Sequence, residues 1–210
     1  MTERPQPPIT TAIVAGGTAR RFGGRLKGLE PVGGRRILDI QVDLCVAAFG
    51  ALPLLITNDP AAAEWRRDLR VAPDVRPGLG ALGGILTAIQ TAPAPVVVLA
   101  WDMPFVTAPL LQALAAELAD ADACLPASPG PRGVEPLCAA YGPATLAAVE
   151  ATLAAGDRRA VGFHDRIKTS ILSPERVREF GDPTTLFFNV NTVDDLAEAD
   201  RLWRKRESLR

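Results

Sequence analysis

The sequence contains few cysteines and a single histidine, and both shortages exclude a kind of site. The three cysteines are widely spaced and form no C-x-x-C pair, which argues against a disulfide framework or a zinc site. We therefore predict that Cys45, Cys124 and Cys138 are reduced core residues of a cytoplasmic protein. With His164 as the sole histidine, no Ser-His or Cys-His pair for nucleophilic catalysis can be assigned.

The chain also lacks a charge excess and a long hydrophobic segment. Its 23 Lys and Arg balance 24 Asp and Glu, so no overall attraction to nucleic acid or to an anionic membrane is expected. The apolar run from Val96 to Trp101 is far short of the roughly 20 residues that cross a bilayer. The 48% hydrophobic content instead predicts a soluble globular protein, with a flexible leader at 1–8 and a single domain at 9–210. The leader lacks the apolar stretch of a secretion signal.

Short apolar runs alternate with segments of helical period, a pattern typical of βαβ units around a mostly parallel sheet. The segment 74–84, DVRPGLGALGG, is rich in glycine and is predicted to be a loop. The sequence thus predicts a Rossmann-like, three-layer α/β/α fold. We expect strands at 9–15, 52–57, 71, 96–100, 123–125 and 137–141, and helices at 37–49, 61–69, 85–91 and 144–155. A further helix is capped by Thr107, and the last one starts at Thr192.

The segment after the first strand has the composition of a phosphate-binding loop. Residues 12–29, AIVAGGTARRFGGRLKGL, combine five glycines with four cations, Arg20, Arg21, Arg25 and Lys27, and no acid. Close approach of backbone N–H groups and clustered positive charge suit a triphosphate. Neither a Walker motif nor a G-x-G-x-x-G fingerprint is present. On these residues alone, a flexible basic surface loop is the alternative.

Five motifs in this chain resemble those of one enzyme family. The loop resembles L-A-G-G-x-x-x-R-M-G-G-x-D-K-G-L, found in nucleotidyltransferases that activate a phosphate monoester with an NTP. Four later segments resemble that family's D-x-x-x-x-G-P-L-A-G, C-D-M-P-F, E-P-L-x-A-L-Y and F-x-N-I-N-T motifs; they are residues 74–84, WDMPF at 101–105, EPLCAAY at 135–141 and FNVNT at 188–192. The chain is most similar to the molybdenum cofactor guanylyltransferase family, the MobA-like NTP transferases. It differs at Phe22, at Arg25-Leu26 and at Trp101, which replaces Cys.

The resemblance implies an Mg²⁺-dependent enzyme that transfers GMP from GTP to the phosphate of (Mo-)molybdopterin, forming molybdopterin guanine dinucleotide and pyrophosphate. Because a phosphate monoester is mostly dianionic at neutral pH, no general base is needed, and catalysis depends on positioning and neutralised charge. A molybdopterin-supplying protein and apo-molybdoenzymes are the candidate protein partners of an expected monomer or weak oligomer. A related cytidylyltransferase, another phosphate or sugar-phosphate nucleotidyltransferase and a noncatalytic nucleotide-binding relative remain alternatives.

The resemblance also implies roles for particular residues near the phosphates. Lys27 and Arg21 hold the charge of the transferred and leaving groups, and Asp102, at the end of a buried strand, holds Mg²⁺. From its local sequence, Asp102 is equally a turn former. The backbone amides of Ala15, Gly16 and Gly17 cradle the phosphates, and Val14, just before them, is a further nucleotide-binding residue.

The remaining implied contacts are with the nucleoside and with the second substrate. Asn58 and Asp74 contact the nucleotide, unless they are a turn residue and a loop cap. The segment containing Leu82 and Gly83 passes close to the base or ribose. Asn189 and Asn191 present their amides to the second substrate, unless Asn191 only begins the last helix.

Overall fold

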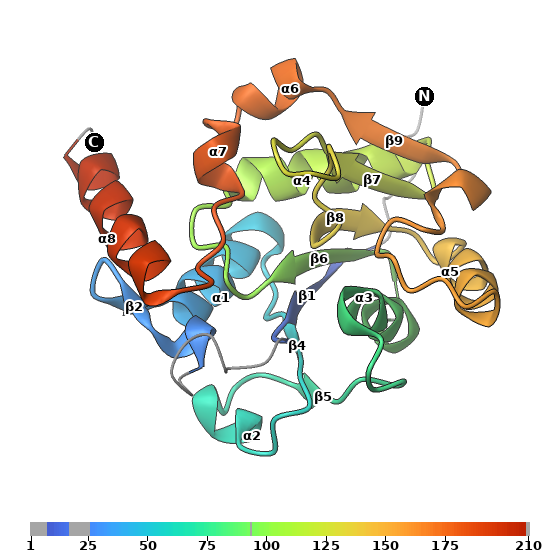
Figure 1. Ribbon diagram of the computed structural model, residues 1–210, viewed down its shortest axis with the longest axis horizontal. Coiled ribbons are helices and arrows are strands. Elements are labelled where there is room, and N and C mark those ends of the chain that lie inside the picture. The colour runs from blue at the N-terminus through green and yellow to red at the C-terminus, as the bar shows by residue number, and fades with distance from the viewer. Residues whose placement is uncertain (1–7, 17–25, 93, 209–210) are drawn as a thin grey trace.

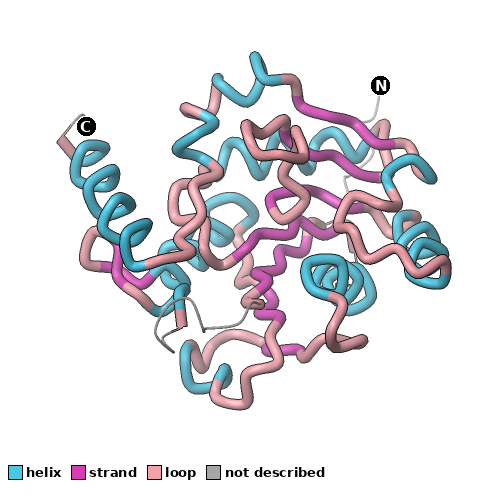
Figure 2. The backbone as a smooth tube through the Cα atoms, in the orientation of Figure 1, coloured by secondary structure: helices cyan, strands magenta, loops and turns pink. Residues whose placement is uncertain are grey.

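A computed structural model describes residues 8–16, 26–92 and 94–208, and within them seven strands form one twisted sheet (Figures 1 and 2). The strand order is β5-β4-β1-β6-β8-β7-β9. Within this sheet, the described pairs β6–β8 and β7–β8 are antiparallel and the others are parallel. The strands are β1 (Thr10–Val14), β4 (Leu54–Ile56), β5 (Val71–Ala72), β6 (Val96–Ala100), β7 (Ala123–Pro126), β8 (Cys138–Tyr141) and β9 (Thr169–Leu172).

Helices cover both faces of this sheet (Figure 1). Helices α1 (Ile37–Phe49) and α4 (Ala108–Ala116) share one hydrophobic cluster with Val97 and Leu99 of β6. Helices α3 (Gly80–Thr91) and α5 (Thr145–Ala154) share the other with Val96 and Val98. Successive side chains of a strand point to opposite faces, so a strand that is apolar throughout must be covered on both. The predicted α/β/α fold is confirmed.

Shorter elements complete the structure. The hairpin of β2 (Pro31–Val32) and β3 (Arg35–Arg36) packs against the last helix, α8 (Val193–Glu207), around a third cluster that includes Phe105 and Val190. Thr192 caps α8 in a reciprocal pair with Asp195. The remaining described elements are short helices: η2 (Lys27–Leu29), α2 (Ala62–Trp65), η3 (Glu117–Ala119), η4 (His164–Arg166), α6 (Pro174–Arg178) and α7 (Pro183–Leu186).

The strand register brings the site's segments together. Val14, the last residue of β1, is paired with Ile56 of β4 on one side and with Ala100 of β6 on the other. These three strands are parallel, so the residues that follow them leave the sheet at the same edge. The carboxyl edge of an open α/β sheet is where such folds bind ligands.

Most predicted elements are confirmed, with α1 and β6 matching their predicted bounds, but three local predictions are wrong. Helix α3 starts at Gly80 and not at Ile85, because core packing of Leu82 and its neighbours outweighs the poor helix propensity of glycine. Helix α2 ends at Trp65, where Arg66 turns extended. Thr107 precedes α4, but its hydroxyl donates to the Phe180 carbonyl and does not cap the helix.

The three cysteines are buried and form no disulfide, as predicted. Burial raises the pKa of the Cys45 thiol to about 12, which makes it unreactive. None of the helices in the described ranges is long and apolar enough to cross a bilayer. The leader at 1–8 falls outside the described residues except for Pro8, and the single-domain assignment stays a prediction.

Candidate functional site

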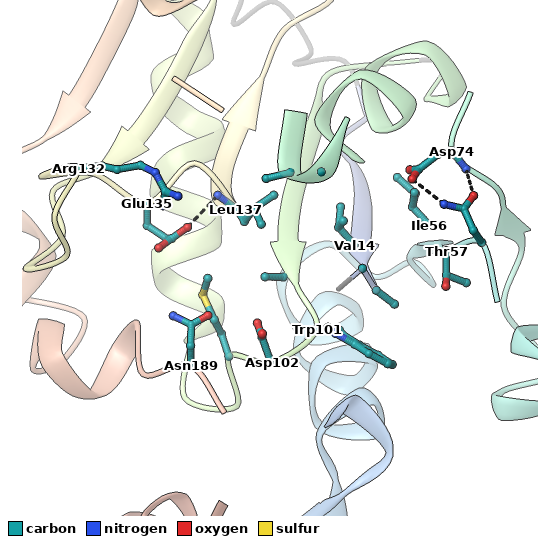
Figure 3. Close-up of a pocket in the computed structure, with 17 residues that line it drawn as sticks. Val14, Ile56, Thr57, Asp74, Trp101, Asp102, Arg132, Glu135, Leu137 and Asn189 are labelled. Atoms are coloured by element: carbon teal, nitrogen blue, oxygen red, sulfur yellow. Dashed lines mark hydrogen bonds between the residues drawn. The ribbon is translucent and has the colours of Figure 1, made fainter. Parts of the chain in front are cut away.

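A cavity of about 480 Å³ opens at the carboxyl edge of β1, β4 and β6 (Figure 3). Arg132 and Glu135 lie on one side of it, Thr57 and Asp74 lie on the other, and the carboxylate of Asp102 points into the space between them. Its volume is that of a typical small-molecule site. The residues predicted from sequence that line it are Val14, Ala15, Gly16, Asn58, Asp74, Asp102 and Asn189.

Three predicted site residues meet at the rim of this cavity. The Lys27 ammonium donates to Oδ2 of Asp102 at 3.0 Å and to Oδ1 of Asn191 at 2.8 Å. These partners lie 75 and 164 residues further along the chain. The side chains of Lys27 and Asp102 are only 14% and 13% exposed. An ammonium has three N–H groups, so beyond these two bonds to described residues one is left for a phosphate oxygen.

The indole of Trp101 supports the backbone that carries Lys27. Gly28 lies directly on the ring, so that a Cβ atom there would be 2.3 Å from Cε3 of Trp101. The ring is held in turn by stacking on Trp65, with centroids 5.5 Å apart, and is 4% exposed. Glycine is required at this close approach. The tryptophan that replaces the family's cysteine therefore forms a platform beneath η2.

Asn58 and Asp74 form a reciprocal pair on the far side of the cavity (Figure 3). The Asn58 amide donates to Oδ2 of Asp74 at 2.7 Å, and the Asp74 backbone N–H donates to Oδ1 of Asn58 at 2.9 Å. The turn before α2 uses Asp59, whose carboxylate accepts from the Ala61 N–H. The Asn58 side chain is therefore hydrogen-bonded to Asp74 on the cavity wall and not within that turn.

One of the backbone amides predicted to cradle the phosphates, that of Ala15, is already hydrogen-bonded. Its backbone N–H donates to the Ile56 carbonyl at 2.8 Å, so this amide is already used by the sheet. The Gly16 N–H makes no such bond to a described residue, and Gly16 is exposed with open space around it. The cradle can begin at Gly16 but not at Ala15. Gly17 and Arg21 lie outside the described residues.

The glycine-rich segment approaches the cavity at a different point from the one predicted. Leu82 is fully buried in the core, and neither Leu82 nor Gly83 lines the cavity, whereas Gly80 and Ala81 do. Gly84 allows α3 to lie against β1, since a Cβ there would be 2.5 Å from Cγ1 of Val14. The binding roles of Leu82 and Gly83 stay predictions.

The two asparagines near the end of the chain behave differently. The Asn189 side chain lines the cavity and donates to the Phe187 carbonyl. Asn191 turns its side chain to Lys27, while its backbone N–H donates to Asp195 at the start of α8. Asn191 thus belongs to the site and to the helix start at once.

Arg132 and Glu135 line the cavity although sequence reasoning gave neither a role. Glu135 belongs to one of the motifs, so the motif was the available signal. Arg132 lies in a loop rich in Pro and Gly, and no motif in that loop indicated a role for it. Burial raises the pKa of the Glu135 carboxyl, and the Asp102 charge adds to this, while the Leu137 N–H and the Arg132 charge oppose it.

The donor set at Asp102 fits Mg²⁺ held jointly with phosphates. No group of three His, Cys, Asp or Glu that would form a protein-only metal cage occurs in the described ranges. Oδ1 of Asp102 accepts no hydrogen bond from any residue that the structure describes. Mg²⁺ typically binds through one or two carboxylates together with substrate phosphates and waters.

The fold and this site define an α/β nucleotidyltransferase. Residues 11–200 match the MobA-like NTP transferase domain, and the chain belongs to this family, as its motifs predicted. It is 35% identical over 190 residues to the probable molybdenum cofactor guanylyltransferase of Chloroflexus aggregans, covering 88% of this chain and 89% of the relative. It is 31% identical over 191 residues to the enzyme of the same description from Pelotomaculum thermopropionicum, covering 90% and 91%.

Two solved structures share this fold. Molybdopterin-guanine dinucleotide biosynthesis protein A from Archaeoglobus fulgidus superposes with a TM-score of 0.78 at 27% identity, over 93% of this chain and 99% of that one. The 4-diphosphocytidyl-2C-methyl-D-erythritol synthase of Anaerococcus prevotii has a TM-score of 0.67 at 16% identity, over 93% and 96%. This second likeness is one of fold alone.

Proposed function

We propose that this protein is a molybdenum cofactor guanylyltransferase, which transfers GMP from GTP to the phosphate of molybdopterin and releases pyrophosphate. The relatives that match nearly the whole chain carry this description. The observation that carries the proposal is the convergence of Lys27, Asp102 and Asn191 at the rim of a cavity of nucleotide size. Molybdopterin-supplying proteins and apo-molybdoenzymes are its proposed protein partners.

The reaction needs positioning and charge neutralisation more than proton transfer. An oxygen of the acceptor phosphate bonds to the α-phosphorus of GTP while the bond to the α–β bridging oxygen breaks, and its electron pair leaves with pyrophosphate. The attacking phosphate is already mostly dianionic at neutral pH. His164 is absent from the described lining of the cavity, so it supplies no base there. The Lys27 ammonium stabilises the negative charge that builds up on the leaving group.

Asp102 would hold Mg²⁺ through Oδ1, which has no partner within the described ranges, and the ion, when bound, would neutralise charge on the nucleotide's phosphates. Lys27 keeps the carboxylate pointing into the cavity through its bond to Oδ2. Arg21 is proposed as a second cation at the phosphates. The Asn58–Asp74 pair is proposed to contact the nucleoside, because it lies on the cavity wall opposite Glu135.

The test is incubation of the purified protein with GTP, Mg²⁺ and molybdopterin while pyrophosphate release is measured. We expect release that requires all three components. CTP, ATP and UTP are compared under the same conditions, and a clear preference for CTP would overturn the choice of base. Tight GTP binding with no pyrophosphate release would instead favour a noncatalytic nucleotide-binding role.

A further inference from the structure

A second cavity, of about 410 Å³, adjoins the first. The two share Arg132, Glu135 and Asn189 in their linings, so these residues stand at the junction between them. The loop 128–134 forms one wall of the second cavity, and Thr184, Phe187 and Phe188 contribute to the other. A ligand in the second cavity would therefore reach the reacting centre past these three shared residues.

Arg132 is presented at this junction on an ordered turn. The loop is closed by the bridge between Ala127 and Val134 and by the hydrogen bond from the Ser128 N–H to the Gly133 carbonyl at 2.9 Å. Figure 3 shows the Arg132 side chain extending over Glu135. No hydrogen bond or ion pair joins its guanidinium to any residue that the structure describes. Its five N–H donors therefore remain available to a ligand.

The positive charges among the described site residues lie in two separate places. Lys27 is at the rim with Asp102 and Asn191 and is absent from the lining of the first cavity, whereas Arg132 is the only cation among the described lining residues. In-line transfer requires the attacking and leaving oxygens on opposite sides of the α-phosphorus. Positive charge on both sides suits this arrangement, because each reacting oxygen then has a cation near it. The side of the Lys27 loop is assigned to the leaving pyrophosphate, which leaves Arg132 for the attacking oxygen.

We propose that Arg132 binds the phosphate monoester of the acceptor and positions its oxygen for attack, with the organic part of the acceptor in the second cavity. This inference rests on the proposed function. The planar guanidinium can hold two oxygens of one phosphate at once, which fixes the direction of the third. Phe187 and Phe188 offer apolar surface to the rest of the acceptor, and Asn189 offers its amide oxygen.

The test compares steady-state kinetics of Arg132→Ala with those of the wild type, using GTP, Mg²⁺ and molybdopterin. We expect the KM for molybdopterin to rise about 10- to 100-fold, the scale of losing a charged hydrogen-bonding partner, while GTP affinity changes less than about twofold. Arg132→Lys retains the positive charge but lacks the planar pair of N–H donors. Its KM for molybdopterin should therefore lie between the values of the wild type and Arg132→Ala. Arg67→Ala is the matched control, since Arg67 is exposed and lines neither cavity.

A second measurement separates phosphate recognition from a structural effect. Dephosphorylated molybdopterin should inhibit the wild type and Arg132→Ala equally, because it lacks the group that Arg132 binds. An unchanged KM for molybdopterin in Arg132→Ala, or an equal loss of GTP affinity, would overturn the proposal. If the wild type releases no pyrophosphate with GTP and molybdopterin, the proposed function itself is wrong. If the wild type is active but the KM of Arg132→Ala is unchanged, only the role of Arg132 is wrong.

Discussion

Replacing Gly28 with alanine is expected to displace Lys27 and slow turnover. The new Cβ would lie 2.3, 2.7 and 3.0 Å from three ring carbons of Trp101. Carbon atoms prefer separations near 3.5 Å, so the two groups must part by about 1 Å. The indole has little room to move because it is buried and stacked on Trp65. The shift therefore falls on η2 and on the Lys27 contacts to Asp102 and Asn191.

A misplacement of about 1 Å at a catalytic group is enough to cost roughly 10²-fold in rate. We expect kcat of Gly28→Ala to fall by about that factor, measured by pyrophosphate release. Overpacking should also lower the free energy of unfolding by about 1–3 kcal/mol, measured in urea. Gly28→Ala/Trp101→Cys removes the ring that causes the clash and should turn over faster than Gly28→Ala. A folded Gly28→Ala with normal kcat, or no gain in the double variant, would refute this account.

Three further predictions concern Lys27 and Asp102, the Asn58–Asp74 pair, and His164. Lys27→Ala and Asp102→Asn should each remain folded by circular dichroism but lose at least about 10²-fold in turnover, since each removes a preorganised charge. Asn58→Ala breaks both hydrogen bonds to Asp74 and should weaken GTP binding about tenfold by calorimetry, with little change in the molybdopterin KM. Burial lowers the pKa of His164 from 6.5 to about 4. Between these values the unfolded chain binds the proton more readily, so the free energy of unfolding should fall as pH drops from about 6.5 to about 4. Because the ring is partly exposed, we expect a loss of about 1–2 kcal/mol, absent in His164→Gln.

Each of these predictions has an outcome that contradicts it. Near-normal turnover in both Lys27→Ala and Asp102→Asn would remove the assigned charges from the mechanism. Unaltered GTP affinity in Asn58→Ala would place the nucleoside elsewhere. Equal acid sensitivity of the wild type and His164→Gln would show that another group controls stability in that pH range.

The elements that sequence predicted best are those in which local pattern and burial agree. The apolar run of β6 and the spacing of Ile37, Ile40 and Leu44 in α1 report burial directly, because periodicity follows from the geometry of each element. The candidate site residues were found in another way, since Lys27 and Asp102 belong to segments that resemble the family's motifs. The start of α3 at Gly80 was not visible, because packing against β1 decides it.

By itself, then, the sequence determined the α/β/α architecture, the family and seven of the 17 residues that line the cavity. Only the tertiary structure decided that Asn191 meets Lys27 across 164 residues, that the Ala15 amide is used by the sheet, and that Arg132 stands between two cavities. Local patterns record which side chains are buried. Contacts between distant segments depend instead on strand order and register, which are set by the packing of the whole chain.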